Sequence, residues 1–178
     1  MEPYAASLTY LFSVIIVCLD VVVVFLAVSR GVMRMWLPPA FDRVLLRYIL
    51  PFASVSALMG VLLSLFYSEI VGFSVCVLCW LSRAMLFPYA LIASVAWVRR
   101  DVQVWPYLLS LAVVGMMITL YHHLYQMGVT AGTLCTTFAN GGDCAARYVF
   151  EFGFVTMPWM GFTLFTVLAF LAWRMRER

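Results

Sequence analysis

Charge is scarce in this chain, and lysine is absent altogether. Charged residues make up 11% of the 178 positions, whereas 66% of the residues are apolar. A soluble domain of this length needs many more charged side chains to keep its surface hydrated. The composition therefore excludes an ordinary water-soluble domain and indicates an integral membrane protein. We expect lipid as its surroundings and no nucleic acid among its partners.

Long polar stretches are also rare, and most of the chain falls into five apolar runs. Each run has about twenty residues, and a helix that rises about 1.5 Å per residue then crosses a hydrocarbon core of roughly 30 Å. The sequence therefore predicts an all-α membrane protein, with an antiparallel four-helix transmembrane bundle and one extra N-terminal transmembrane helix. The runs cover roughly residues 7–28, 48–67, 75–98, 106–127 and 157–173.

The first run lacks the features of a cleavable signal peptide. Glu2 is the only charged residue before it, so a basic n-region is missing, and the run is too long for a typical signal core. We therefore expect it to remain as a transmembrane helix. Residues 1–43 would hold this helix and a cytoplasmic loop, and residues 44–178 would form the four-helix unit.

Because lysine is absent, the orientation in the membrane rests on arginine alone. Nine of the eleven arginines fall on one side when five spans alternate. The positive-inside rule puts that side in the cytoplasm, so the sequence predicts an N-terminus outside and a cytoplasmic C-terminus. The nine are Arg30, Arg34, Arg43, Arg47, Arg99, Arg100, Arg174, Arg176 and Arg178.

Four of the five cysteines then fall on the outer side. Cys76 and Cys79 form a CxxC pair at the start of the third run, and Cys135 and Cys144 lie in the only long polar loop. Outside a bacterial inner membrane the compartment is oxidising, so disulfides persist there. Cys18 lies within the first run, where we expect it to pack as a small apolar residue.

The CxxC pair admits several interpretations. Ser74 is expected to cap the third helix, which would place Cys76 in the first turn, where free N–H groups and the helix dipole favour a thiolate. Two intervening residues allow a short disulfide. A structural disulfide and half of a four-cysteine zinc site are the alternatives to redox chemistry. Zinc is disfavoured because an oxidising compartment oxidises its ligands, and no metal ligand is assigned.

Four polar residues within the apolar runs also need an explanation. Arg83 lies four residues after Cys79, so the two share a helix face. One interpretation is that Arg83 faces a thiolate or a reduced quinone. The other is that its side chain extends to the outer membrane interface. His122 and His123 lie near the outer end of the fourth run, at about the depth of Cys79. At most one of them should face that site, because consecutive helical residues diverge by about 100°. Asp20 lies inside the first run, and no role is assigned to it.

The loop pair is close in sequence. Eight residues, two of them glycine, separate Cys135 from Cys144, so the loop is short and flexible enough to close a disulfide. A disulfide in such a loop tends to be exchangeable, and a soluble dithiol protein could attack it. The other interpretation is a structural disulfide that only holds the loop closed.

These motifs resemble those of the DsbB family of bacterial disulfide bond formation proteins, over about residues 44–173. The CxxC pair precedes the loop pair, as in that family, whereas the order is reversed in the vitamin K epoxide reductase-like relatives. The resemblance is carried by Cys76-Val77-Leu78-Cys79 with Arg83 four residues on, by Tyr121-His122-His123, by Gly142-Asp143-Cys144-Ala145-Ala146-Arg147 and by Met157-Pro158-Trp159.

The resemblance implies a bundle that oxidises a DsbA-like periplasmic thioredoxin-fold protein and passes two electrons to a quinone, either ubiquinone or menaquinone. On the matching positions, Cys135 would form the mixed disulfide with the partner, and Cys144 would exchange with Cys76.

The remaining matching positions concern the quinone. Cys79 would meet the quinone ring, Arg83 would assist the quinone site, and His123 would be its neighbour. Three features depart from the family pattern: Ser82 stands where an acidic residue often precedes the arginine, the loop between the paired cysteines is short, and the first span is extra.

The sequence-based hypothesis is thus a quinone-dependent thiol oxidase of the bacterial inner membrane. A non-catalytic membrane scaffold or receptor subunit with two structural disulfides is one competing class. A membrane protein with a four-cysteine metal site is the other.

Overall fold

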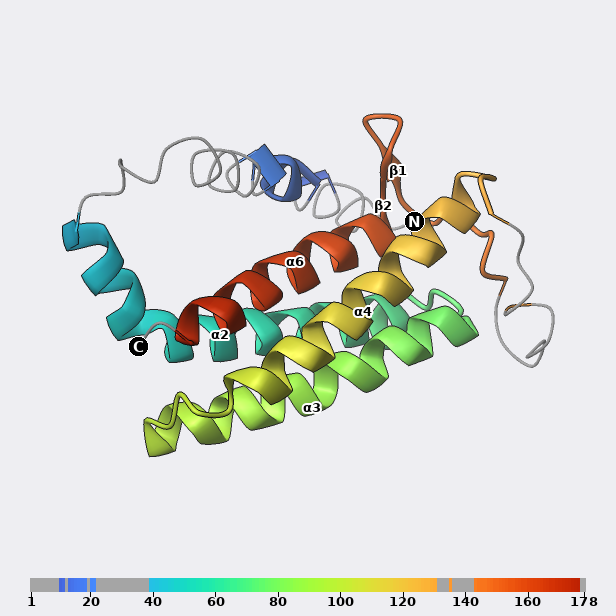
Figure 1. The fold of residues 1–178 in the computed structure, drawn as a ribbon. Coiled ribbons are helices and arrows are strands. Elements are labelled where there is room, and N and C mark those ends of the chain that lie inside the picture. The colour runs from blue at the N-terminus through green and yellow to red at the C-terminus, as the bar shows by residue number, and fades with distance from the viewer. Residues whose placement is uncertain are drawn as a thin grey trace.

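The computed structural model describes residues 10, 11, 13–18, 20, 21, 39–130, 135 and 143–176. Within this part of the chain, four long helices run side by side (Figure 1). They are α2 at Pro39–Leu65, continued by a π-helical turn η1 at Phe66–Ile70, then α3 at Val77–Arg99, α4 at Trp105–Gln126 and α6 at Met157–Met175.

Four of the predicted membrane spans are confirmed. Among the described residues, the helical segments long and apolar enough to cross a membrane are Tyr48–Ile70, Val77–Arg99, Trp105–Gln126 and Met157–Met175. The fifth predicted span, residues 7–28, lies largely outside the described residues, and those of it that are described are helical. The chain is therefore a mostly helical, multi-pass membrane protein.

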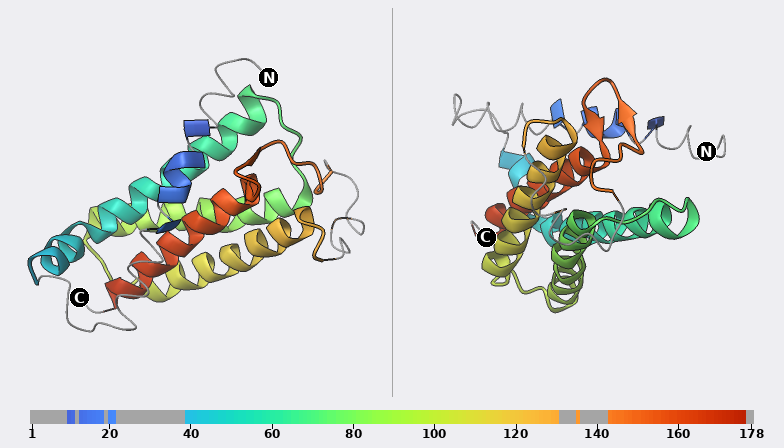
Figure 2. Two further views of the ribbon diagram at one scale, coloured as in Figure 1. Left: turned by 90° about the horizontal axis from the view of Figure 1, so that it is seen from above. Right: turned by 90° about the vertical axis from the view of Figure 1, so that its right-hand side faces the viewer.

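The four helices pack through small residues. Helices α2 and α4 each contact both α3 and α6, as Figures 1 and 2 show. A Cβ atom on Gly115 of α4 would lie 2.4 Å from Cε1 of Phe165 on α6, so these two helices approach as closely as they do because that position is glycine. Fully buried alanines line the other contacts: Ala53, Ala57, Ala93, Ala112 and Ala172.

Prolines mark two helix starts, as the sequence indicated. Pro106 and Pro158 occupy the first positions of α4 and α6, where a missing N–H group removes no helical hydrogen bond. Helix α2 begins at Pro39 and so runs through the boundary that the sequence suggested between residues 43 and 44.

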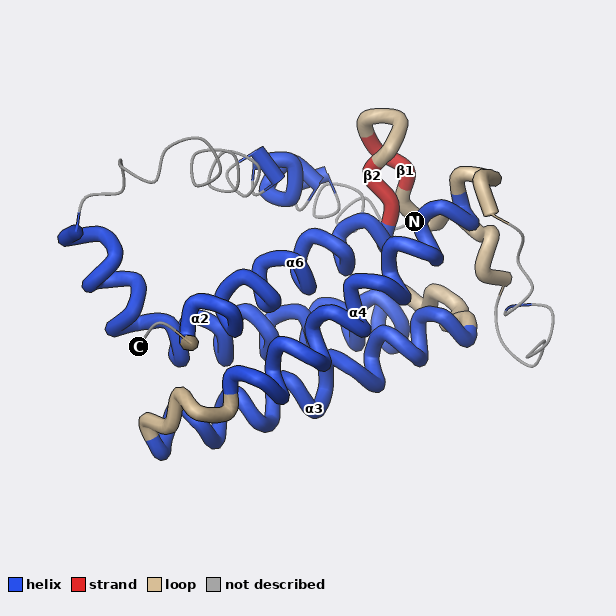
Figure 3. Tube along the Cα trace, viewed as in Figure 1, coloured by secondary structure: helices blue, strands red, loops and turns tan. Residues whose placement is uncertain are grey.

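A short β-hairpin, which the all-α prediction did not include, precedes α6. Strand β1, Phe150–Glu151, pairs antiparallel with β2, Val155–Thr156 (Figure 3). Gly153 has a φ of 78° in the turn, a conformation that glycine adopts without the strain of a Cβ atom. Thr156 then caps α6, since its side chain accepts a hydrogen bond from the Trp159 N–H. Strands of two residues are too short to produce an alternating pattern in the sequence.

Candidate redox site

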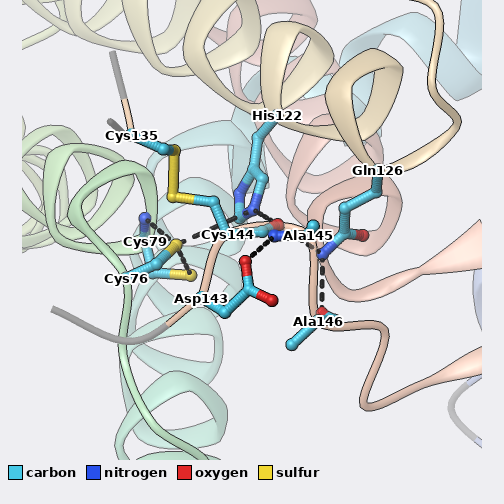
Figure 4. Close-up of a disulfide and its surroundings, with 9 residues drawn as sticks. All are labelled: Cys76, Cys79, His122, Gln126, Cys135, Asp143, Cys144, Ala145 and Ala146. Atoms are coloured by element: carbon cyan, nitrogen blue, oxygen red, sulfur yellow. Dashed lines mark hydrogen bonds between the residues drawn. A yellow bond between two sulfur atoms is a disulfide. The ribbon is translucent and has the colours of Figure 1, made fainter. Parts of the chain in front are cut away.

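The two cysteine pairs lie together at one end of the helices (Figure 4). Cys135 and Cys144 form a disulfide, with Cα atoms 6.3 Å apart. Cys144 belongs to the same buried cluster as Cys76, and Cys79 and Cys135 pack against this cluster. The sequence predicted only that both pairs share one side of the membrane, and the structure places them in contact.

Cys76 itself caps α3, which begins one residue later. Its Sγ atom accepts a hydrogen bond from the Cys79 N–H, at 3.4 Å. The prediction that Ser74 caps this helix is therefore wrong, because the Ser74 hydroxyl hydrogen-bonds to that of Tyr148 instead. The helix-dipole argument still applies to Cys76, since the capping sulfur lies against the free N–H groups of the first turn.

Cys76 is the thiol of the reduced CxxC pair that ionises first. Its Sγ lies 3.1 Å from that of Cys79 and 3.7 Å from Nε2 of His122. The hydrogen bond with Cys79 is the largest cause that lowers the pKa of Cys76, while burial opposes it and His122 lowers it further. This direction favours a thiolate at Cys76 rather than at Cys79 in the reduced pair.

His122 contacts both cysteine pairs. Besides its contact with Cys76, its Nε2–H donates to the Cys144 carbonyl oxygen, at 3.1 Å. Gln126, one turn further along the same face of α4, donates to the carbonyl oxygens of Cys144 and Ala146, at 3.4 and 3.0 Å. These two α4 side chains hold the Cys144 segment against the CxxC pair.

Arg83 is buried and fixed to the neighbouring helix. Its Nε donates to the Ser64 hydroxyl at 2.7 Å, and one terminal nitrogen donates to the Ser64 carbonyl at 2.6 Å. The guanidinium carbon lies 5.4 Å from the ring centroid of Trp80, and the side chain is 6% exposed. The interpretation of Arg83 as an arginine that extends to the interface is therefore wrong, because its polar contacts lie within the protein.

A cavity of about 480 Å³ adjoins these residues. Its walls are mainly apolar side chains of α2 and α6, together with Ile15 and Ile16 from the first predicted span. An apolar cavity with a few convergent polar groups is the usual form of a small-molecule site. The cysteine and polar side chains that line it include Ser64, Cys76, Cys79, Arg83, His122 and Gln126.

A comparison of the sequence with models of known families gives a result that agrees with the thiol chemistry of this site. The model of the family described as "Disulfide bond formation protein DsbB" matches residues 46–175, close to three quarters of the chain. The chain belongs to the DsbB family. It is accordingly a disulfide-forming membrane protein, and the class of its chemistry is that of a thiol oxidoreductase.

Curated proteins named as disulfide formation proteins are similar to this chain over most of their own length. "Disulfide bond formation protein C" of Bacillus subtilis (strain 168) is 34% identical over 125 residues, which cover 68% of this chain and 88% of that protein. "Probable disulfide formation protein" of Metapseudomonas resinovorans is 34% identical over 122 residues, 68% of this chain and 85% of that protein. No solved structure matches the chain.

His123, the histidine that the DsbB-family resemblance singled out, lies apart from the CxxC pair. Its Nδ1 is 2.9 Å from the Thr156 hydroxyl, and its ring is 4.8 Å from that of Trp159. The cavity lining includes His122 and does not include His123. The quinone-site role given to His123 stays a prediction. Counting residues from the helix end predicted the depth of the two histidines in the membrane, but not which of them faces Cys76.

The first predicted span lies before the DsbB-family match and is anchored to α6. The Asp20 carboxylate accepts hydrogen bonds from Nε1 of Trp159, at 2.9 Å, and from the Thr163 hydroxyl, at 2.6 Å. Figure 2 shows this segment alongside α6. Cys18 is exposed, so the expectation that it packs inside the protein is wrong.

Sequence reasoning missed two polar residues, Gln126 and Ser64. Gln126 carried a usable signal, because it lies four residues after His122 and so shares its helix face. Ser64 carried none, since its partner Arg83 is distant in sequence. Asp20 was noticed as an acid inside the first run, but its partners Trp159 and Thr163 are too distant in sequence to indicate a role.

Proposed function

We propose that this chain is a quinone-dependent thiol oxidase of a bacterial inner membrane. A DsbA-like periplasmic thioredoxin-fold protein supplies electrons as a dithiol and leaves as a disulfide. A membrane quinone, ubiquinone or menaquinone, accepts the electrons. The four cysteines Cys76, Cys79, Cys135 and Cys144 carry them between the two.

The contact between the two cysteine pairs carries this proposal. Cys144, bonded to Cys135, lies in the same buried cluster as Cys76, which is within hydrogen-bond distance of Cys79. Thiol–disulfide exchange needs a thiolate next to a disulfide sulfur. Two structural disulfides need no such contact, so the arrangement favours a relay over a non-catalytic scaffold.

The first exchange takes place at the loop disulfide. A partner thiolate attacks Cys135, the Cys135–Cys144 bond breaks, and a mixed disulfide forms while Cys144 leaves as a thiolate. The second partner thiol then displaces Cys135. The partner has lost two electrons and two protons, and the loop pair has gained them. Cys135 suits this step because it is less buried than Cys144.

The second exchange passes the electrons inward. The Cys144 thiolate attacks Cys76 of an oxidised CxxC pair, and Cys79 leaves as a thiolate. Cys135 then attacks Cys144, which restores the loop disulfide and leaves Cys76 and Cys79 reduced. Figure 4 shows the loop disulfide beside the Cys76 and Cys79 thiols, whose sulfur atoms lie 3.1 Å apart.

The cavity beside the CxxC pair suits the quinone. Its volume of about 480 Å³ lies within the usual range for small-molecule sites, and its apolar walls suit a quinone ring with an isoprenoid tail. A bound quinone supplies the capacity to take up two electrons and two protons. Cys79 and Arg83 line the cavity, and the Arg83 guanidinium stabilises negative charge there. His122 holds a proton at Nε2 at the same wall.

The membrane arrangement is part of the proposal. The four described helices cross the bilayer as an antiparallel bundle, and the first span crosses as an extra helix packed on α6. The cysteine pairs face the periplasm, so the N-terminus lies outside and the C-terminus in the cytoplasm. This orientation rests on the nine arginines that fall on one side.

An anaerobic mixing experiment tests the function. The purified chain is mixed with a reduced DsbA-like protein and a quinone, and quinol formation is followed by absorbance. We expect one quinol for each disulfide formed in the partner, no turnover in Cys79→Ser or Cys135→Ser, and near-normal turnover in Cys18→Ser. Partner oxidation without quinol formation, or full activity in Cys79→Ser, would rule out the proposed relay.

A further inference from the structure

Three metal-ligating side chains converge at the CxxC pair, and this geometry allows a second use of the residues that serve the disulfide relay. The two sulfur atoms of Cys76 and Cys79 and a ring nitrogen of His122 all lie within 4.8 Å of one another. Cys76 and His122 are buried, at 2% and 4% exposed. Thiolate sulfur and imidazole nitrogen are the ligands that zinc and similar thiophilic cations prefer.

The separations are close to those of a tetrahedral zinc site. Zn–S bonds of about 2.3 Å and Zn–N bonds of about 2.0–2.1 Å put ligand sulfur and nitrogen roughly 3.6 Å apart, and two sulfurs roughly 3.7 Å apart. The distance from Cys76 Sγ to His122 Nε2 is 3.7 Å, and that between the two sulfurs is 3.1 Å. The third separation, from Cys79 Sγ to the His122 ring nitrogen, is within 4.8 Å. The Cys79 side chain, which is the less buried of the two cysteines, would have to rotate for all three atoms to reach one cation.

We propose that Cys76, Cys79 and His122 form a redox-gated binding site for a thiophilic divalent cation such as Zn²⁺. The site exists only while the CxxC pair is reduced, because a disulfide between Cys76 and Cys79 removes both thiolates. Binding changes no oxidation state: the cation takes two thiolates, and the thiol protons go to solvent. The three side chains leave a fourth coordination position open on the side of the adjoining cavity.

This site differs from the four-cysteine site that the sequence left open. Cys135 and Cys144 are bonded to each other and offer no thiolate. Its third protein ligand comes instead from α4, which no cysteine spacing could reveal. The structure thus assigns a Cys₂His set from two helices rather than a Cys₄ set from a helix and a loop.

Metal binding competes with the hydrogen bond from His122 that holds the Cys144 segment in place. The Cys144 carbonyl can only accept, so His122 carries its proton on Nε2 while it makes that 3.1 Å hydrogen bond. Coordination through Nε2 moves this proton to Nδ1 and releases the carbonyl, which Gln126 then holds alone. A bound cation therefore blocks both thiolates and loosens Cys144, which makes it an inhibitor of exchange between the two pairs.

Cobalt binding tests the site without quinone or partner. The full chain in detergent, in a Cys18→Ser, Cys135→Ser, Cys144→Ser background, keeps only the CxxC thiols. After anaerobic reduction with a phosphine it is titrated with Co²⁺, and thiolate-to-cobalt charge-transfer absorbance is recorded. We expect one Co²⁺ per chain, displaced by Zn²⁺, and none after the CxxC pair is oxidised.

The two neighbouring histidines supply the matched comparison. His122→Ala should weaken binding by roughly tenfold or more, as the loss of a ligand does, whereas His123→Ala should leave it unchanged. Equal binding by oxidised protein, unchanged binding in His122→Ala, or a loss confined to His123→Ala would overturn the proposal. If the triple-serine background does not fold, the same Co²⁺ titration of the reduced, otherwise native chain with and without His122→Ala separates this site from the loop thiols.

The inhibitory effect alone rests on the proposed oxidase function. Reduced chain loaded with Zn²⁺ and freed of excess metal should form no quinol on mixing, and a chelator should restore the rate. Unchanged turnover at full metal occupancy would remove the inhibitory role. A chain that binds Co²⁺ as described but never forms quinol would contradict the oxidase function and leave the metal site in place.

Discussion

Arg83 holds a positive charge beside the CxxC pair, where water is largely excluded. Burial makes such a charge costly unless polar groups compensate it, and Ser64 supplies two acceptors. The guanidinium also lines the cavity assigned to the quinone. Its position favours a role in stabilising negative charge there.

Arg83→Ala should therefore impair quinone use much more than partner oxidation. The loss of a charge-assisted hydrogen bond costs about 1.5–3 kcal/mol, or roughly ten- to more than a hundredfold in affinity or rate. Arg83→Lys should recover part of this loss, because lysine keeps the charge without the planar fork. Steady-state turnover against quinone concentration gives the answer, with single-turnover partner oxidation as the control. An unchanged quinone dependence in Arg83→Ala would remove Arg83 from the site.

The adjacent histidines should separate by function. His122→Ala removes the side chain that contacts both Cys76 and Cys144, so exchange between the pairs should slow about tenfold. His123→Ala alters the contacts with Thr156 and Trp159 and should slow that exchange little. Rapid-quench alkylation after a single addition of reduced partner measures the step. A larger effect at His123 would return the site role to that residue.

At the residue scale, the sequence predicted the chemistry better than the contacts. The types and spacing of Cys76, Cys79 and Arg83 indicate thiol chemistry on one helix face, and the structure places these residues along one cavity. The choice between His122 and His123 depends on how α4 is rotated against α3. Packing sets that rotation, and two adjacent polar residues in an apolar run leave it undetermined.

At the scale of elements, apolar length predicted the four described spans, and proline predicted the starts of α4 and α6. The start of α3 was placed wrongly, because a cysteine capped the helix in place of the more usual serine. The hairpin before α6 was missed because its strands have two residues each. Sequence signals for a helix cap or a two-residue strand are weak, and the packing of the long helices overrides them.

The first predicted span lies before the residues that the family model matches, 46–175. A carboxylate within a membrane span is stable only with polar partners, and Asp20 finds two donors on α6. Ile15 and Ile16 of the same segment line the cavity. Anchoring at Asp20 therefore completes the wall of the proposed quinone site.

Asp20→Ala should detach the first span from α6. Two hydrogen bonds to a carboxylate are lost, worth about 3–6 kcal/mol together, so the melting temperature in detergent should fall and the KM for quinone should rise. Asp20→Asn retains an acceptor oxygen and should lose less of both. The single-turnover rate of partner oxidation serves as the internal control. A melting temperature and KM equal to those of the unaltered chain would show that the anchor has no such role.

At the scale of the whole molecule, the relay requires both cysteine pairs on the outer side. Reporter fusions before Met1 and after Arg178 should lie on opposite sides of the membrane, the first in the periplasm and the second in the cytoplasm. The absence of lysine makes the arginine distribution the sole basis for this orientation. A periplasmic C-terminal reporter would put the cysteine pairs on the reducing side and exclude exchange with a periplasmic partner.

The electron path from loop pair to CxxC pair is tested most directly by trapping its intermediate. In Cys135→Ser, the free Cys144 thiolate has no resolving partner, so it should attack the oxidised CxxC pair and stop at a Cys76–Cys144 disulfide. Alkylation followed by mass mapping should find that linkage together with an alkylated Cys79, and the Cys144→Ser control should keep its Cys76–Cys79 disulfide. An intact Cys76–Cys79 disulfide beside an alkylated Cys144 in the Cys135→Ser protein would contradict the relay.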